Sequence, residues 1–404
     1  MLRLPIENTL DREEKTMAEW QTVRLGEIVK TNQSTYSPKE NWQFVNYLDT
    51  GNITMNKIDE IQYINTAKDK LPSRARRKVK TNSIIYSTVR PNQLHYGIIK
   101  EQPDNFLVST GFTVIDVNYD KAVPDFIYYA LTKQEVTEQL QAIAEQSVSA
   151  YPSLKPSDIE NLELMLPDKK AQERIVDILR SIDEKIKENN AINNNLEQQA
   201  VAVFNKFYDA STNQQPFTTL INVLGGGTPK TGNPEFWDGS IPFFTPKDVG
   251  TPYTFKTEKY ITELGLKHCN SRLYPTNTTF VTARGTVGKI SLAGAPMAMN
   301  QSCYALTNDI VDPLLVYFYV LKAVNALKHK ASGAVFDAIV TRDFDGEIIN
   351  ILSDADSEAA LSIIKPMMEA IHNNSKENMR LSAVRDTLLP KLMSGELDVS
   401  DLDL

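Results

Sequence analysis

One stretch decides the fold: residues 171–208, with the sequence AQERIVDILRSIDEKIKENNAINNNLEQQAVAVFNKFY. Apolar residues and Asn recur along it at alternating steps of four and three, which gives a seam of period 3.5. The seam positions are Ile175, Leu179, Ile182, Ile186, Asn189, Asn193, Leu196, Ala200, Val203 and Phe207. No Gly or Pro interrupts the stretch, so we expect one helix of roughly 55–60 Å. Isolated helices are marginal in water, and the seam therefore needs a partner.

A matching seam lies 185 residues further along the same chain. Its positions are Ile364, Met367, Ile371, Asn374, Asn378, Leu381, Arg385, Leu388 and Leu392, of which Arg385 is the clear exception in character. Pro366 lies inside this second helix and is expected to kink or restart it.

The two seams predict equivalent helices packed on each other. An antiparallel pair would set Asn189 beside Asn378 and Asn193 beside Asn374. Buried Asn pairs cost stability but fix register, which is the role we favour for these four residues. The alternative is that the Asn residues lie in a wet, loosely packed middle.

The chain as a whole has the order module, helix, module, helix, which indicates a tandem duplication. The predicted fold class is α+β, with two similar globular α/β domains separated by two long antiparallel coiled-coil helices in a pseudo-twofold internal repeat. The predicted divisions are an N-terminal extension at 1–17, a first module at 18–167, a long helix at 168–208, a linker at 209–216, a second module at 217–352, a C-terminal helix at 357–396 and an acidic tail at 397–404.

Corresponding elements are expected inside the two modules. Short runs of β-branched and aromatic residues predict strands. In the first module they lie at 44–48, 84–89 and 112–117, and a helix is expected at 125–144. In the second module the strands lie at 241–244 and 279–282, and a helix follows Pro313 through Lys330.

Composition limits the class of protein. No apolar run approaches the 18 residues that a membrane span requires, so we expect no membrane partner. Two cysteines and four scattered histidines form no zinc or disulfide pattern, and a cytoplasmic location fits best. The net charge is −8, yet residues 68–100 carry nine Lys and Arg and only one acid, Asp69. Such a basic segment on an acidic frame is typical of a DNA reader that also holds protein partners.

Catalytic motifs are not visible in the sequence. The run GGGTPKTG at 225–232 lacks the Lys-Ser/Thr that a phosphate loop requires. We find no Ser/His/Asp set, no paired carboxylates in a plausible pocket and no metal-ligand spacing, so we predict neither catalytic nor metal-binding residues.

The predicted DNA-binding residues are Arg, Lys, Asn, Gln and Thr in comparable loops of the two modules. Arg and Lys bind phosphate, and Arg, Asn and Gln can also read base edges. In the first module they are Arg74, Arg76, Arg77, Lys78, Lys80, Thr88, Arg90 and Asn92. In the second they are Thr228, Lys230, Lys247, Thr282, Arg284, Thr286, Lys289, Asn300 and Gln301. For any one of these residues a solvated surface position is the alternative.

Four motifs now give the chain a resemblance to the specificity subunits of type I restriction-modification systems, over residues 18–396. They are AQERIVDILRSIDEKI at 171–186, GGTPKTGNPEFWDGSIPFFTPKDV at 226–249, ARGTVGKI followed by NQS at 283–302, and LSAVRDTLLPKLMSGEL at 381–397. The first module departs from the pattern, because residues 33–35 are Gln-Ser-Thr where glycines are expected and Arg90 is followed by Pro91 instead of Gly.

The resemblance implies a function. Two target recognition domains would each read one half of a bipartite site in double-stranded DNA, and the helices would set the spacer and dock two methyltransferase subunits. S-adenosylmethionine, ATP and Mg would be bound by those subunits and by the restriction subunits, with no cofactor on this chain. Because the recognition loops differ while the helices match, we expect two unlike half-sites, with centres roughly 34–36 Å apart. The alternatives are a coiled-coil scaffold and a self-sufficient DNA methyltransferase or nuclease.

Overall fold

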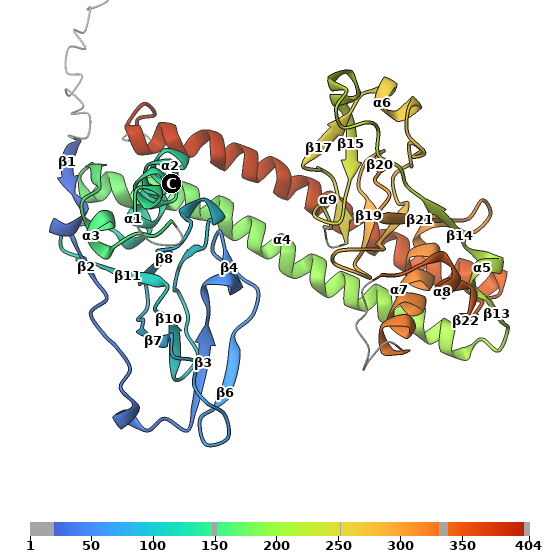
Figure 1. The fold of residues 1–404 in the computed structure, drawn as a ribbon, viewed down its shortest axis with the longest axis horizontal. Helices are drawn as coiled ribbons and strands as arrows, with labels where there is room; N and C mark the ends of the chain where they lie inside the picture. Colours follow the sequence, from blue (N-terminus) through green and yellow to red (C-terminus); the bar gives the residue numbers. More distant parts are fainter. Residues whose placement is uncertain (1–19, 148–151, 251, 331–337, 400–404) are drawn as a thin grey trace, which may run out of the picture. The chain divides into compact units, whose positions relative to one another are not determined.

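The computed structural model describes residues 20–147, 152–250, 252–330 and 338–399 (Figure 1). The expected N-terminal extension and the end of the acidic tail therefore lie outside the described residues. The chain divides into two compact units, Met1–Glu184 with Ser382–Leu404, and Lys185–Leu381. Helices α4 (Lys169–Ala210) and α9 (Asp354–Ser394) each contribute to both units. Within the described residues no helix is long and apolar enough to cross a membrane.

The first unit contains two four-stranded sheets, with orders β6-β3-β10-β7 and β2-β11-β8-β9, and a β1-β12 pair. Its main strands are β1 (Gln21–Arg24), β2 (Val29–Thr31), β3 (Phe44–Leu48), β6 (Gln62–Asn65), β7 (Ala75–Lys78), β8 (Ile84–Ser87), β9 (Tyr96–Ile98), β10 (Phe106–Ser109), β11 (Phe112–Val117) and β12 (Glu163–Leu166). A short hairpin joins β4 (Ile53–Thr54) to β5 (Lys57–Ile58). The strands expected at 44–48 and 112–117 are present with those bounds, and the strand expected at 84–89 ends at Ser87.

The helix expected at 125–144 is wrong as a single element. The structure has α1 (Pro124–Leu131) and α2 (Gln134–Glu145), followed later by α3 (Pro156–Glu160). The break is local, because Lys133 has an extended backbone and the hydroxyl of Thr132 donates to the carbonyl of Tyr129. That hydrogen bond satisfies a carbonyl at the end of α1, and the chain then starts again as α2.

The core of the first unit joins α1 to the two long helices. Phe126 and Ile127 of α1 are fully buried, in one cluster with Ile175 and Leu179 of α4 and with Leu392 of α9. The seam residues of this part of α4 therefore serve both the module and the partner helix.

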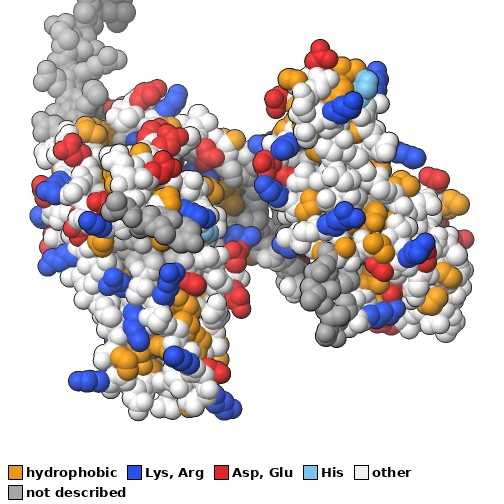
Figure 2. Space-filling view, viewed as in Figure 1, with side chains coloured by type: hydrophobic (Ala, Val, Ile, Leu, Met, Phe, Trp, Pro, Cys, Tyr) orange, Lys and Arg blue, Asp and Glu red, His pale blue; other side chains and the backbone are white. Residues whose placement is uncertain are grey.

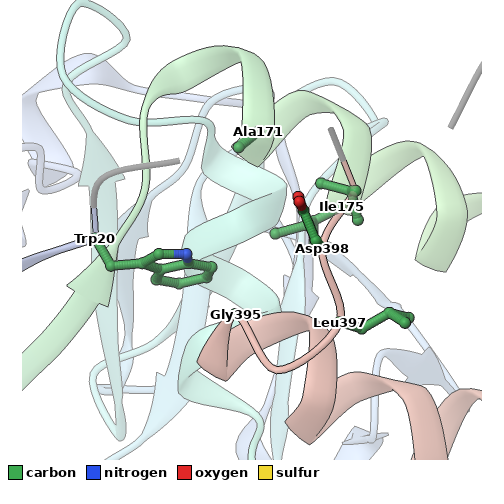
Figure 3. Close-up of a pocket in the computed structure, with 7 residues that line it drawn as sticks. Trp20, Ala171, Ile175, Gly395, Leu397 and Asp398 are labelled. Atoms are coloured by element: carbon green, nitrogen blue, oxygen red, sulfur yellow. The ribbon is translucent and has the colours of Figure 1, made fainter. Parts of the chain in front are cut away.

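The segment after α9 folds back onto the first unit. Gly395 has φ +77°, and a Cβ there would lie 2.6 Å from the indole nitrogen of Trp20. A guanidinium nitrogen of Arg174 donates to the carbonyl of Val399, which is buried. The cavity that remains between Trp20, Ile175 and Gly395 (Figure 3) is about 20 Å³, room for a single water at most. Among the described residues, this cavity is therefore too small to hold a ligand larger than water.

The second unit has a five-stranded sheet, β14-β21-β18-β19-β16, and a three-stranded sheet, β17-β15-β20. The strands are β13 (Gln214–Pro216), β14 (Asn222–Gly225), β15 (Trp237–Phe244), β16 (Tyr253–Thr254), β17 (Lys259–Ile261), β18 (Thr279–Thr282), β19 (Ile290–Ala293), β20 (Ala298–Met299), β21 (Cys303–Thr307) and β22 (Ile348–Asn350). The helices are α5 (Phe217–Leu220), α6 (Glu263–Lys267), α7 (Pro313–Lys330) and α8 (Thr341–Asp345). The strand at 279–282 and the helix at 313–330 have the expected bounds.

The expected linker at 209–216 is not a free connection. Its first two residues, Asp209 and Ala210, complete α4, and Gln214–Pro216 is strand β13, paired antiparallel with β22. The polar composition and Pro216 favoured a linker, but an edge strand tolerates Pro because one side of its backbone needs no partner.

The duplication is visible in the strand orders of the two units. The order β2-β11-β8-β9 corresponds to β14-β21-β18-β19, with antiparallel pairing throughout both series. The order β6-β3-β10 corresponds to β17-β15-β20, and in each the central strand has one parallel and one antiparallel neighbour. The first unit adds β7 to this sheet, and the second adds β16 to its larger sheet. The two modules thus share the arrangement of these strands and differ in the strand that each one adds.

The two long helices run antiparallel in each unit. In the second unit the side-chain amide of Asn189 donates to Asn378, and that of Asn374 donates to Asn193, both at 2.9 Å. As the position on α4 advances by four, the partner on α9 moves back by four, which is the pairing that the seams predict. Asn189 is 1 % exposed and Asn193 is 6 % exposed, while Asn374 and Asn378 are half-buried, so the α4 side of this layer is closed to water.

Arg385, the exception in the second seam, is explained by the first unit. Its guanidinium donates to Asp183 of α4 at 2.9 Å, and the hydroxyl of Tyr129 donates to the other oxygen of that carboxylate at 2.7 Å. Burial works to lower the pKa of Arg385, but its hydrogen bonds with Asp183 and Asp386 raise it overall. Helix α9 continues through Pro366 as one element, so of the expected kink or restart the restart does not occur. Exposed Pro366 costs the helix one hydrogen bond, while its neighbours Ile364 and Met368 are fully buried against the unit.

Candidate nucleic-acid interface

The basic residues of the first module lie on and beside edge strand β7. Arg74 precedes the strand and is exposed, while Arg76, Arg77 and Lys78 lie within it and are half-buried. Figure 2 shows Lys and Arg side chains spread over the part of the first unit that carries β3, β6, β7 and β10, with few acidic side chains among them. A surface of this kind favours a polyanion.

Not all of these cations are equally available to DNA. Lys78 forms an ion pair with Glu40 and lies 5.0 Å from the centre of the Trp42 ring. The hydrogen bond from Lys78 holds the pKa of Glu40 below its usual value. Lys80 lies 3.6 Å from Asp116. Burial lowers the pKa of Arg77, whose Nε is buried without a partner among the described residues.

A second basic loop follows β8 and carries the Arg90-Pro91 sequence. Arg90 is exposed and has φ 48°, a left-handed conformation that is unusual for Arg and more so before Pro. The backbone N–H of exposed Asn92 donates to the side chain of Gln141 on α2. The hydroxyl of Thr88 donates to the carbonyl of Gly111 at 2.9 Å, so this residue holds the loop in place.

The glycine-rich stretch of the second module packs closely on another loop. A Cβ at Gly226 would lie 2.1 Å from the carbonyl oxygen of Asn300, and a Cβ at Gly227 would lie 2.5 Å from the backbone nitrogen of Asn270. Only Gly fits at these two positions. The hydroxyl of Thr228 then donates to the side chain of Gln301. The predicted residues Thr228, Asn300 and Gln301 therefore belong to one cluster, and Lys230 nearby is exposed.

The loop after β18 corrects one predicted contact. Thr282 is fully buried, and its hydroxyl donates to the carbonyl of Thr286 and accepts from the backbone N–H of Lys289. Thr282 closes the loop and cannot contact DNA directly, because a strand-end hydroxyl is needed to satisfy the turn. Gly285 and Gly288 have φ +81° and +74°, which the turn requires.

The other predicted residues of this loop lie at the surface. Arg284, Thr286 and Lys289 are exposed. The hydroxyl of Thr286 donates to the carbonyl of Pro246 at 3.3 Å. The next residue, Lys247, is exposed and lies 3.5 Å from Glu258.

The structure adds residues that the sequence did not single out. Five connections of the first unit surround a hollow of about 490 Å³, lined by Thr50, Arg74, Arg90, Gln93, His95, Gly111, Ser153 and neighbouring residues. Thr50 and His95 carried no sequence signal, because the connections that contribute to the hollow are far apart along the chain. Within the described residues, no group of three or more His, Cys, Asp or Glu could hold a metal ion.

Comparison with known proteins agrees with the duplication of the module. The family described as "Type I restriction modification DNA specificity domain" matches residues 17–198 and again residues 218–380. The chain belongs to this family. The two matched segments fall on the two halves of the duplication, and together they cover most of the chain.

Individual relatives extend the comparison. The chain is 25% identical over 470 aligned positions to the type I restriction enzyme HindI specificity subunit of Haemophilus influenzae, covering 94% of this chain and 100% of that protein. It is 28% identical to the MjaIX specificity subunit of Methanocaldococcus jannaschii, over 40% of this chain and 39% of that protein. A crystal structure of a type I restriction-modification S subunit from M. genitalium shares the fold, with TM-score 0.56 and 15% identity over 96% of this chain and 98% of that one.

Proposed function

We propose that this chain is the DNA-specificity subunit of a type I restriction-modification complex. The observation that carries the proposal is the duplicated module on paired helices, matched twice by the family of DNA specificity domains. Each module would read one half of a bipartite site in double-stranded DNA. Arg74 and Arg90 in the first module, and Arg284 and Lys289 in the second, are exposed cations in loops of the kind that contact DNA.

The two half-sites are unlike in this proposal. A protein with identical readers related by a twofold axis reads a palindrome. Here the two modules share a strand order but differ in the segments added to it. The first module has the basic strand β7, and the second has the Gly226–Thr228 turn packed on Asn300. The different chemistry of these loops supports two different half-sites with an unread spacer between them.

The helices would fix the length of that spacer and dock partner subunits. The Asn layer gives α4 and α9 one register in the second unit, and the Asp183–Arg385 pair joins the same helices in the first. We propose that two methyltransferase subunits bind to the helices and that restriction subunits join the assembly. The chain itself would be non-catalytic, and S-adenosylmethionine, ATP and Mg would be bound by the partner subunits.

DNA binding by the purified chain at two salt concentrations tests the proposal. A reader that neutralises several phosphates loses affinity steeply as salt rises. The same preparation, given S-adenosylmethionine and DNA, should leave the DNA unmethylated until the methyltransferase subunits are added. Absence of salt-sensitive binding would favour a scaffold, and methylation by the chain alone would favour a self-sufficient enzyme.

A further inference from the structure

The hollow in the first unit is lined by two of the predicted DNA-contact residues, Arg74 and Arg90, and by residues that the sequence did not single out. Its volume of about 490 Å³ lies within the range of roughly 300–1,000 Å³ that small-ligand pockets occupy. Arg74, Arg90, Gln93 and His95 contribute their side chains, and none of the described residues that line it is Asp or Glu. The hollow lies between the two basic loops of the module. Its position and its charge suit a group carried by DNA.

The backbone around the hollow is held in a strained arrangement. Arg90 and Leu94 have φ 48° and 57°, and Met55 has φ 46°. Non-glycine residues in this region cost roughly 1–3 kcal/mol each and persist only where the surroundings hold them. Here the backbone N–H of Met55 donates to the carbonyl of Leu94 at 2.9 Å, and the N–H of Ser87 donates to the carbonyl of His95 at 2.9 Å. The loop is therefore formed before any ligand arrives, which lowers the entropic cost of binding.

The hydrogen bonds of His95 fix the chemistry of its ring. Nδ1 lies 2.6 Å from the carbonyl oxygen of Ile53 and 3.3 Å from the hydroxyl of Thr54. A carbonyl oxygen only accepts, so Nδ1 carries the proton. In the neutral ring Nε2 is then an acceptor. His95 lines the hollow, and no hydrogen-bond partner of its Nε2 exists among the described residues.

We propose that His95 is a specificity-determining residue of the first module, and that its Nε2 accepts a hydrogen bond from the exocyclic amino group of one base. In the major groove only adenine and cytosine present an amino donor. Gln93, exposed on the same hollow, can donate to and accept from an adenine edge, so the pair favours adenine. This inference rests on the proposed function, since it names the chemistry of one base that the module would read.

The test is selection of DNA sites from a duplex library by the full chain in complex with its methyltransferase subunits. His95→Ala should relax the preference at one A·T pair in one half-site, by roughly 5- to 20-fold. His268→Ala is the matched control, because that exposed ring also has Nδ1 against a backbone carbonyl, of Leu264, but belongs to the second module. It should leave the half-site of the first module unchanged.

A second arm tests the hydrogen bond itself. If the relaxed base is adenine, replacing it with 2-aminopurine removes the major-groove amino group while pairing with thymine is kept. Wild type should lose about as much affinity for that duplex as His95→Ala loses for the natural one. The His95→Ala variant should bind the natural duplex and the 2-aminopurine duplex with equal affinity. If His95→Ala unfolds, His95→Asn replaces it, because the amide N–H of Asn can still donate to the carbonyl of Ile53 while the Nε2 acceptor is removed.

The outcomes separate this inference from the function on which it rests. Retained binding with no relaxed position would overturn the role of His95 while leaving the proposed function standing. A relaxed A·T pair at which 2-aminopurine leaves the affinity of wild type unchanged would overturn the assignment of Nε2 as an acceptor, and a relaxed G·C pair would overturn the preference for adenine. If wild type selects no sequence at all, the proposed function fails, and the role of His95 fails with it.

Discussion

The Asn layer between α4 and α9 gives the sharpest prediction about how the helices are held. The side-chain amide of Asn374 donates to Asn193 at 2.9 Å, and Asn193 makes a longer contact of 3.3 Å with the hydroxyl of Ser375. We consider the changes Asn193→Leu and Asn374→Leu, alone and together. Each single change leaves one amide facing a methyl group, whereas the double change removes both polar groups.

The magnitudes follow from the burial of the two residues. Loss of one hydrogen bond costs about 0.5–1.5 kcal/mol, and an unsatisfied buried group adds roughly 1–3 kcal/mol. Asn374 is half-buried and can recover part of this cost from water, while Asn193 is only 6 % exposed. We therefore expect each single variant to lose about 1–2 kcal/mol, with Asn374→Leu the more damaging. A Leu–Leu pair in the seam should restore wild-type stability or exceed it, which gives an interaction energy of at least about 2 kcal/mol.

Urea unfolding of the full chain, followed by circular dichroism, measures these differences. Asn194→Leu with Asn373→Leu is the matched control, because both residues are exposed neighbours of the layer; it should change stability by less than about 0.5 kcal/mol. Additive losses in the double variant would refute the idea that the two amides act as one pair. The restored double variant should also select DNA sites of less uniform spacing, since one of the two Asn pairs that specify register has gone and only Asn189–Asn378 remains.

Three further predictions concern single side chains. Arg74→Ala should weaken DNA binding and reduce the slope of log affinity against log salt by about 1, if Arg74 contacts a phosphate; an unchanged slope would place it away from the backbone. Arg385→Met should destabilise the chain by roughly 1–3 kcal/mol in thermal unfolding, because Asp183 loses its ion-pair partner and remains partly buried. If stability is unchanged, solvent alone satisfies the carboxylate of Asp183. Burial raises the pKa of Cys303 to about 12, so this thiol should resist alkylation at pH 8 while half-buried Cys269 reacts. The raised pKa also means that the contribution of Cys303 to stability is complete below pH 9 and is lost between about pH 9 and 12.

Many of the strands and helices could be predicted because the sequence patterns that indicate them are local. The strand at 112–117 and the helix at 313–330 follow from short alternating runs and from a Pro at the first helical position. The Asn pairing followed from the period of the two seams. The split between α1 and α2 was not predictable from periodicity, because the apolar pattern continues across the break that Thr132 and Lys133 create.

The candidate site was predictable only in outline. Sequence charge identified the basic segment of the first module, but not that Lys78 pairs with Glu40, which lies 38 positions earlier. Thr282 has a residue type suited to DNA contact, yet the turn uses its hydroxyl. His95 gains its significance from a carbonyl 42 positions away and from a hollow bounded by five connections. Contacts of such long range are set by the fold as a whole and leave no local pattern.

The spacing of the two half-sites tests the central claim most directly. One heptad added to α4 and one added at the matching position of α9 lengthens each helix by roughly 10 Å, the rise of about three base pairs. Sites selected by the wild-type complex should consist of two unlike half-sites with a fixed spacer, and the lengthened chain should select the same half-sites with a wider spacer. Identical spacing before and after the insertion, or a single uninterrupted site, would contradict the account.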